Sequence, residues 1–170
     1  NEIDRIVGYF PAESFLKHVM DINEKKNLTS ELISQYKIKP SGIDENYKLG
    51  MKYFDEGDFE NAGKYITYVL ANADKSSDIY TECMLKDAAS KGETKTLQNY
   101  LNESPNGKFA KDAKMSLAEL TYGKDNNLKE AEKIYLNMLE NYPADEDVFF
   151  GYAQFIRWKI YTITADSTVD

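Results

Sequence analysis

The chain of 170 residues carries 29 acidic and 21 basic residues, which give a net charge of −8 and a pI near 4.8. This balance argues against nucleic acid and against an anionic membrane surface as partners, because both reward clustered Lys and Arg. No apolar run approaches the roughly 20 residues needed to span a bilayer, whereas a hydrophobic content of 42% supports a folded core in one domain, or in one domain and a fragment.

The first 24 residues predict a strand followed by a helix. Residues 2–7 alternate roughly between polar and apolar side chains and end at Gly8, as a short strand would. Pro11 then begins a helix, since proline is tolerated in the first helical turn. The apolar face of this helix comprises Phe15, Leu16, Val19, Met20 and Ile22.

This segment, EIDRIVGYFPAESFLKHV, resembles the carboxyl end of a thioredoxin-like domain: a last strand, a glycine corner and a closing amphipathic helix. The resemblance covers about residues 1–22 and implies that a redox-active cysteine pair would lie upstream of Asn1. The chain begins with Asn1 rather than Met, and we expect it to be part of a longer protein. The alternative is an ordinary strand or extended arm that packs beside the remaining helices.

Residues 25–43 predict a linker with one short helix. Leu28, Leu32, Ile33 and Tyr36 follow helical spacing, and Thr29 or Ser30 is expected to cap the helix. Pro40 and Gly42 then end it. The expected organisation is therefore a thioredoxin-like remnant at 1–24, the linker at 25–43 and helical repeats at 44–170.

The stretch from Tyr47 to Asn72 predicts two amphipathic helices in a hairpin. Its apolar and small residues recur at steps of three and four on either side of a turn, residues 55–58, in which Gly57 is free to take a left-handed conformation and Asp58 can cap the next helix. Gly50 and Ala62 have almost no side chain, so we expect the two backbones to approach closely there.

The same seam recurs later in the chain. The residue types at Phe59, Ala62 and Ile66 return at Leu128, Ala131 and Tyr135, 69 positions later, and half of that distance is close to the period of about 34 residues of the tetratricopeptide repeat. The chain resembles that family over about residues 45–143, although the middle copy lacks the small residue at the helix crossing. The matching residues are Leu49, Gly50, Tyr53, Gly57, Phe59 and Ala62 in the first copy and Leu117, Ala118, Leu128, Ala131, Tyr135 and Pro143 in the last.

The expected fold class is therefore all-α: stacked antiparallel helix hairpins in a tetratricopeptide-like right-handed superhelix, with a short N-terminal strand remnant. A final helix over 148–161 carries aromatic side chains nearly all round, although terminal repeats usually present a polar outer face. Either a further repeat follows it, or this face meets a partner, and homodimerisation through the 148–161 helix is one alternative.

The sequence offers no catalytic constellation, and we expect neither an active site nor a cofactor or metal in this chain. His18 is the only histidine and Cys83 the only cysteine, which is interpreted as a buried structural thiol that leaves the cellular compartment open. The acidic segments at 55–58 and 145–147 lack the twelve-residue loop of a calcium-binding hand and are interpreted as turn and helix-capping residues.

The remaining prediction is a binding surface. In stacked hairpins the first helix of each pair lines the concave side, and Tyr, Met and Phe are enriched at the cores of interfaces. The alternative is that these side chains pack against a neighbouring helix. The predicted partner-binding residues are Tyr47, Met51, Phe54, Lys86, Met115 and Tyr122, with Glu82 and Glu119 extending the surface.

The resemblance also implies what this surface binds. Some tetratricopeptide domains clamp a peptide carboxylate, but Tyr47, Met51 and Asp55 stand where the polar or cationic clamps would be, which argues against a free carboxyl terminus as the ligand.

Three functions follow from these interpretations. The first is a non-catalytic helical-repeat module for protein interaction, C-terminal to a thioredoxin-like domain and binding a protein or apolar peptide. The second is the specificity or scaffold part of a thiol-disulfide oxidoreductase whose active site lies outside this chain, which would imply an extracytoplasmic, periplasmic location. The third is a structural dimerisation module.

Overall fold

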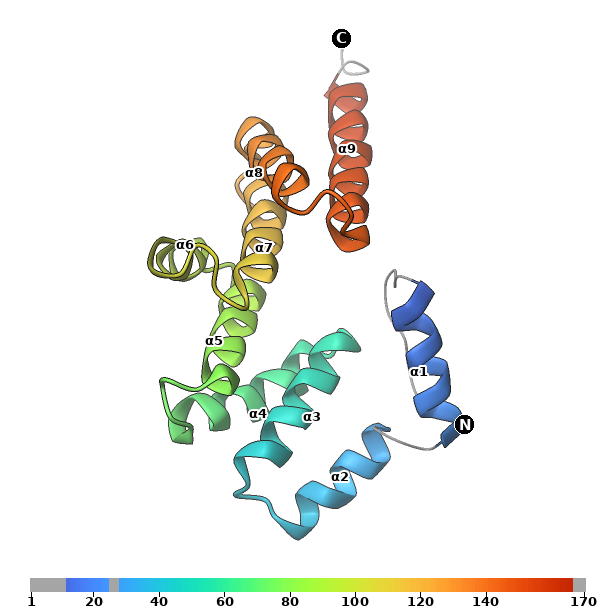
Figure 1. Cartoon of the computed structure of the whole chain (residues 1–170), viewed down its shortest axis with the longest axis vertical. Helices are drawn as coiled ribbons and strands as arrows, with labels where there is room; N and C mark the ends of the chain where they lie inside the picture. Colours follow the sequence, from blue (N-terminus) through green and yellow to red (C-terminus); the bar gives the residue numbers. More distant parts are fainter. Residues whose placement is uncertain (1–11, 25–27, 167–170) are drawn as a thin grey trace. The chain divides into compact units, whose positions relative to one another are not determined.

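The structure, a computed structural model, describes residues 12–24 and 28–166 and shows only helices and their connections there (Figure 1). The all-α prediction is confirmed for these residues, whereas the predicted strand at residues 2–7 lies outside them. The helices are α1 (Ala12–Glu24), α2 (Thr29–Ile38), α3 (Ile43–Asp55), α4 (Phe59–Asn72), α5 (Asp78–Lys91), α6 (Thr94–Glu103), α7 (Ala110–Gly123), α8 (Leu128–Asn141) and α9 (Glu146–Asp166).

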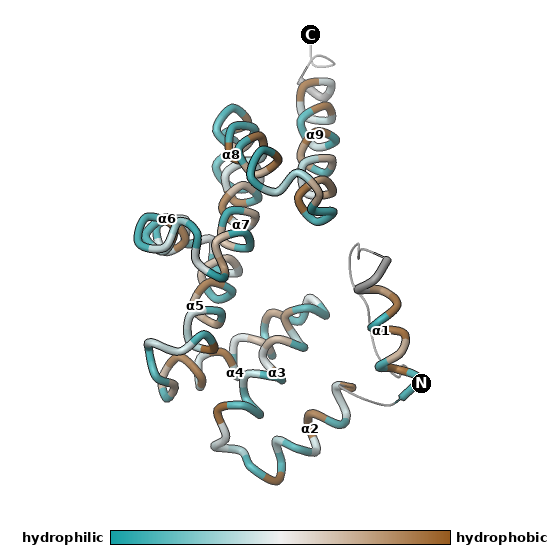
Figure 2. Tube along the Cα trace, in the orientation of Figure 1, coloured by the Kyte–Doolittle hydropathy of each residue, from teal (hydrophilic) through white to brown (hydrophobic). Residues whose placement is uncertain are grey.

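The helices form two compact units, residues 1–90 and residues 91–170. Apolar and polar positions alternate along the helices of both units, as they do in amphipathic helices that bury one face (Figure 2). In the first unit α2 and α4 pack against α3, and in the second unit α7 packs against α6, α8 and α9. The predicted domain boundaries after residues 24 and 43 stay predictions.

Helices α3 and α4 form a hairpin whose backbones approach closely at Gly50. A Cβ atom placed on Gly50 would lie 3.0 Å from Cγ1 of Ile66 and 3.3 Å from its backbone nitrogen. Ala62, on the facing helix, is 1% exposed and packs with Ile66, Val69 and Cys83. The predicted small residues therefore lie at the helix crossing, and Cys83 is buried as predicted.

Helices α7 and α8 repeat this packing in the second unit. Ala118 and Ala131 are fully buried at the contact, where they pack with Tyr135 and with Phe155 of α9. The predicted echo of the Gly50 and Ala62 contact is therefore confirmed. Because each pair of helices crosses at small residues, the same local geometry arises from two different sequences.

The turns between paired helices recur with the period of the repeat. Gly57, Gly92 and Asn126 have φ angles of 76°, 69° and 51°, and they lie 35 and 34 residues apart. Each precedes the N-cap residue of the next helix, and the three N-cap residues, Asp58, Glu93 and Asn127, have nearly the same backbone angles, with φ of −87°, −88° and −96° and ψ of 72°, 73° and 76°. The middle copy, whose sequence match is weak, thus keeps the turn of the other two.

Side-chain caps complete two of these turns. The Asp58 carboxylate accepts a hydrogen bond from the backbone N–H of Asn61 at 3.1 Å, and the Asn127 side chain accepts one from the N–H of Glu130 at 3.2 Å. These bonds satisfy amide groups that the first helical turn leaves unpaired. The predicted capping role of Asp58 is confirmed.

The start of α2 differs from the prediction. Leu28 is the N-cap residue, and no side chain caps the helix, so the proposed capping by Thr29 or Ser30 is wrong. The Thr29 hydroxyl instead donates a hydrogen bond of 2.6 Å to Oε1 of Glu56, at the end of α3. A contact 27 residues away in the chain competes successfully with the local cap.

The loop between α2 and α3 is held by a buried amide. Asn46 is 2% exposed, and its Nδ2 donates to the carbonyl oxygens of Pro40 at 2.9 Å and Gly42 at 2.8 Å. Residues 40 and 42 separate the two helices, as predicted. The Asn46 side chain thereby satisfies loop carbonyls that proline-containing turns leave without a helical partner.

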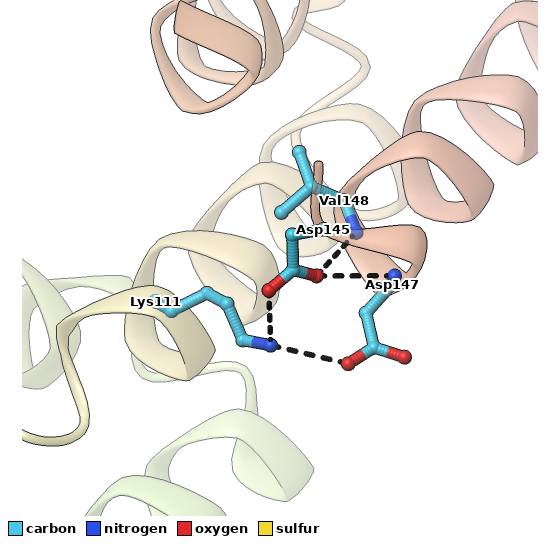
Figure 3. A network of polar contacts seen from close by, with 4 residues as sticks. All are labelled: Lys111, Asp145, Asp147 and Val148. Carbon is cyan, nitrogen blue, oxygen red and sulfur yellow. Dashed lines mark hydrogen bonds and ion pairs between the residues drawn. The ribbon is translucent and has the colours of Figure 1, made fainter. Parts of the chain in front are cut away.

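A cluster of charged groups fixes the beginning of α9 on α7 (Figure 3). Nζ of Lys111 lies 2.9 Å from Oδ2 of Asp145 and 3.1 Å from Oδ2 of Asp147. Oδ1 of Asp145 accepts from the backbone N–H groups of Asp147 at 3.1 Å and Val148 at 3.2 Å. Burial acts to raise the pKa of Asp145, but the Lys111 and backbone donors outweigh it and lower the pKa below its ordinary value. The predicted capping role of this acidic segment is confirmed for Asp145.

Candidate functional site

Four of the six predicted partner-binding residues come together on α3 and α5, in the first unit. The Tyr47 hydroxyl of α3 donates a hydrogen bond of 2.6 Å to Oε2 of Glu82 on α5. Burial, and then the hydrogen bond and negative charge of Glu82, raise the pKa of Tyr47. Tyr47 is therefore a neutral donor that orients a carboxylate, rather than a proton-transfer group.

The second pair on this face combines a ring with a cation. Nζ of Lys86 lies 4.9 Å from the centre of the Phe54 ring, within the range of a cation–π contact. The Phe54 ring also meets Phe59 edge-on, with 5.2 Å between ring centres. Met51, one helical turn before Phe54, is partly buried against the same apolar cluster. We name Tyr47, Met51, Phe54, Glu82 and Lys86 the α3–α5 face.

The α3–α5 face is half-buried, so its side chains serve both packing and surface. Tyr47, Met51 and Phe54 pack on the buried cluster that includes Cys83. Burial raises the pKa of the Cys83 thiol to about 12, which keeps it protonated and unreactive at neutral pH. This face can bind a partner through apolar area and paired charges, and it holds no nucleophile.

The other two predicted residues, Met115 and Tyr122, lie on α7 in the second unit and contact α9. Met115 packs against the backbone of Gly151, where an added Cβ would lie 2.5 Å from Cε of Met115. The Tyr122 ring lies 5.4 Å from the ring centres of both Phe155 and Trp158. The alternative role considered for these residues, packing against a neighbouring helix, therefore applies to both.

Tyr122 also borders a small hollow of about 280 Å³ at the surface of the second unit. Two turns of α9 supply the rest of its lining, which comprises Gln154, Arg157, Trp158 and Tyr161. Arg157 is exposed, and no ion pair joins it to a carboxylate within the part of the chain that the structure describes. Three aromatic rings beside an unpaired guanidinium can hold a side chain that is both apolar and acidic, because Arg binds carboxylates through two parallel donors.

The two faces occupy corresponding positions of the repeat. Tyr47 and Met115 are 68 residues apart, as are Phe54 and Tyr122, and the same displacement relates Lys86 over the Phe54 ring to Gln154 beside Tyr122. Sequence reasoning missed Arg157 and Trp158 as lining residues because it assigned their helix to dimerisation. The displacement of 35 residues from Tyr122 to Arg157 is the signal that could have found them.

A larger cavity of about 920 Å³ lies among α6, α7 and α8, away from all six predicted residues. Leu101, Leu117 and Ile134 form part of its lining, and charged residues surround them. Several of these charges already have partners: Nζ of Lys159 lies 2.7 Å from Oε2 of Glu132, and Nζ of Lys133 lies 3.5 Å from Oε1 of Glu130. Since its charges largely neutralise one another, this cavity has less to recognise a ligand than the hollow at Arg157.

Catalytic and metal chemistry find no support in the described residues. Within them, no three His, Cys, Asp or Glu side chains lie close enough to hold a metal ion. The prediction for the His18 side chain falls outside the described residues. Among the helices that the structure describes, none has the length and apolar character needed to cross a membrane. Comparisons with protein-family models, with curated proteins and with solved structures returned no match to this chain.

Proposed function

We propose that this chain is a non-catalytic, tetratricopeptide-like interaction module that binds a segment of another protein along the surfaces formed by successive first helices. The observation that carries the proposal is the hollow at Tyr122, Trp158 and Arg157, where aromatic rings surround an exposed cation that has no carboxylate partner in the described residues. Trp, Tyr and Arg are the residue types that contribute most often to binding hot spots.

The repeat supports the proposal, because it places a similar surface in each unit. The α3–α5 face combines aromatic and sulfur-containing side chains with one carboxylate and one ammonium group. A bound segment that offers apolar side chains and an internal carboxylate suits both surfaces. A free carboxyl terminus suits them less, because Tyr47 and Met51 occupy the positions where the clamps of that family stand.

The link to a thioredoxin-like domain stays a prediction. It rests on about residues 1–22, of which residues 1–11 lie outside the described part of the chain. The proposed interaction module does not depend on it.

The test is a set of immobilised peptides in which Asp or Glu stands beside Phe, Leu or Trp, each made with an amidated and with a free carboxyl terminus. We expect the wild-type chain to retain amidated peptides of this type and Arg157→Glu to weaken their binding at least tenfold. Lys95→Glu is the matched control, since Lys95 is an exposed cation of the same unit outside the hollow. Equal retention of these peptides by Arg157→Glu and Lys95→Glu, or no retention by wild type, would contradict the proposal.

A further inference from the structure

Helix α9 carries an exposed apolar seam that neither its core contacts nor the hollow uses. Phe149, Ile160 and Ile163 are 51%, 58% and 57% exposed, and Ala153 is exposed on the same face, with Ile156 half-buried between them. These five residues, the α9 seam, follow one another at steps of four, three, four and three. That spacing is the stripe by which one helix packs along another.

The α9 seam is distinct from the two other faces of the helix. The core face carries Val148 and Phe155, which are fully buried. At 100° per residue, the seam lies about a third of a turn from both the core face and the hollow at Gln154 and Trp158. Apolar positions continue along the length of α9 rather than ending with its buried part (Figure 2). One apolar face of α9 is therefore left to solvent.

The repeat indicates what covers such a face. Ala153 lies 35 residues after Ala118, which in turn lies 68 residues after Gly50. Gly50 is the point where α4 packs on α3, and Ala118 packs with Ala131 of α8. Ala153 holds the same position on a first helix, but it is exposed, and within the described residues no second helix follows α9.

We infer that the α9 seam binds an amphipathic α-helix of a partner protein, which lies antiparallel to α9 as α4 lies on α3 and α8 on α7. The partner helix carries Ala or Gly opposite the seam's centre, where two backbones approach, and apolar residues on either side. This inference rests on the repeat geometry and not on the peptide-binding function proposed above.

Charges beside the seam define the partner further and argue against a second copy of the chain. Arg157 and Glu146 flank the seam on one side, so a carboxylate opposite Arg157 and a basic residue in the last turn of the partner helix would complement them. An antiparallel pair of α9 helices centred on Ile156 would instead place Arg157 beside its own copy. Like charges at that spacing are unfavourable.

The α8 sequence provides a probe, because α8 covers the corresponding face of α7. We specify a fluorescent peptide of residues Leu128–Asn141, with a hydrocarbon staple joining positions 129 and 133, both of which are exposed in the chain. The staple removes most of the cost of folding a short isolated helix. Fluorescence anisotropy is then measured while the full 170-residue chain is titrated in.

We expect saturable binding below 1 mM, about the weakest affinity that −4 kcal/mol supports, and at least tenfold weaker binding by Ile160→Asp. Gln154→Asp is the matched control, since it adds the same charge to an exposed position on the hollow side of α9. Both positions are exposed, so circular dichroism should show wild-type helix content in each variant.

Three results would overturn the inference. The first is the absence of saturable binding by wild type, and the second is equal affinity in Ile160→Asp and Gln154→Asp. The third is a wild-type dimer in analytical ultracentrifugation that Ile160→Asp dissociates, because the occupant of the seam would then be a second copy.

Discussion

The Tyr47 hydroxyl donates a hydrogen bond of 2.6 Å to Oε2 of Glu82, across 35 positions of the sequence. That separation is one repeat, so the bond joins the same stretch of two successive first helices. Its acceptor is a carboxylate, and hydrogen bonds to charged groups are stronger than those between neutral groups. The pair ties α5 to the α3–α4 hairpin and orients one edge of the α3–α5 face.

We predict that Tyr47→Phe lowers the free energy of unfolding by about 1.5–3 kcal/mol, the usual contribution of a hydrogen bond to a charged group. The change removes only the hydroxyl and leaves the ring in its apolar surroundings. Urea denaturation followed by circular dichroism measures the effect. Tyr80→Phe is the control and should change stability by less than about 0.5 kcal/mol, because no hydrogen bond of the Tyr80 hydroxyl is seen in the structure. Equal losses in both variants would show that the Glu82 contact contributes nothing.

The Lys111–Asp145 pair predicts a dependence of stability on pH. The pKa of Asp145 is lower in the folded chain than its ordinary value of 3.8, so its stabilising contribution is complete above that value and is lost as pH falls through the folded pKa. A double-mutant cycle with Asp145→Asn and Lys111→Met should give a coupling energy of about 0.5–1 kcal/mol at pH 7. The coupling should vanish at pH 2, where the carboxylate is protonated.

The cycle provides its own control, because the same four proteins are compared at both pH values. A coupling energy that is unchanged between pH 7 and pH 2 would mean that the pair is not an ion pair. Added salt should reduce the coupling at pH 7, since the Asp145 and Lys111 side chains are about a quarter exposed, 26% and 27%.

The repeated turns predict opposite effects of glycine at two neighbouring positions. Asn126 has a φ of 51°, a conformation that glycine adopts without strain, so Asn126→Gly should leave stability unchanged or raise it by up to about 1 kcal/mol. Asp125→Gly, one residue earlier, should lower stability by about 0.5 kcal/mol, because it only adds freedom to the unfolded chain.

The same reasoning applies to the first turn in reverse. Gly57 has a φ of 76°, and Gly57→Ala should cost about 1–2 kcal/mol. Thermal unfolding of the three variants tests the set. If Asn126→Gly destabilises the chain as much as Asp125→Gly does, the turn after α7 does not share the left-handed geometry of the turn after α3.

The hairpins could be predicted from sequence because their determinants are local. Small residues at Gly50 and Ala62, a turn glycine at Gly57 and a capping residue at Asp58 lie within one short stretch, and their types alone indicate a helical hairpin. Residues 128–139 repeated the same types, so two weak patterns supported each other. The middle copy kept Gly92, and the structure shows that this residue has the left-handed φ of the other turns.

Contacts between distant residues could not be predicted in the same way. Thr29 has the composition of a helix cap, yet its hydroxyl binds Glu56, and nothing near Thr29 in the sequence indicates that partner. Lys111 and Asp145 are 34 residues apart and meet only because α9 packs on α7. The spacing of the repeat could have suggested both Lys111 and Arg157, provided that α9 had been aligned as a fourth first helix.

The site prediction was correct in its residues and incomplete in its surroundings. Tyr47, Met51, Phe54 and Lys86 do lie together, but two of them are engaged with Glu82 and with one another rather than free in a groove. Met115 and Tyr122 contact α9 instead of open solvent. A helical pattern shows which residues share a face, whereas the depth of their burial depends on the helix that packs next.

The central claim is that paired helices cross in close contact at small residues, once in each repeat. Gly50 and Gly63 provide a matched test, since both lie inside helices of the same hairpin. An added Cβ would meet Ile66 at 3.0 Å from Gly50, whereas nothing lies within 4 Å of the corresponding position at Gly63. Alanine is favoured over glycine inside a helix by about 1 kcal/mol, so any difference between the two substitutions reports the contact.

The decisive measurement is the free energy of unfolding of Gly50→Ala and Gly63→Ala, determined by urea denaturation under the same conditions. We predict that Gly63→Ala stabilises the chain by about 0.5–1 kcal/mol and that Gly50→Ala falls below it by at least about 1 kcal/mol, because the extra methyl group crowds Ile66. Equal stabilisation by the two substitutions would contradict the close crossing of α3 and α4, and with it the repeat architecture on which the proposed function depends.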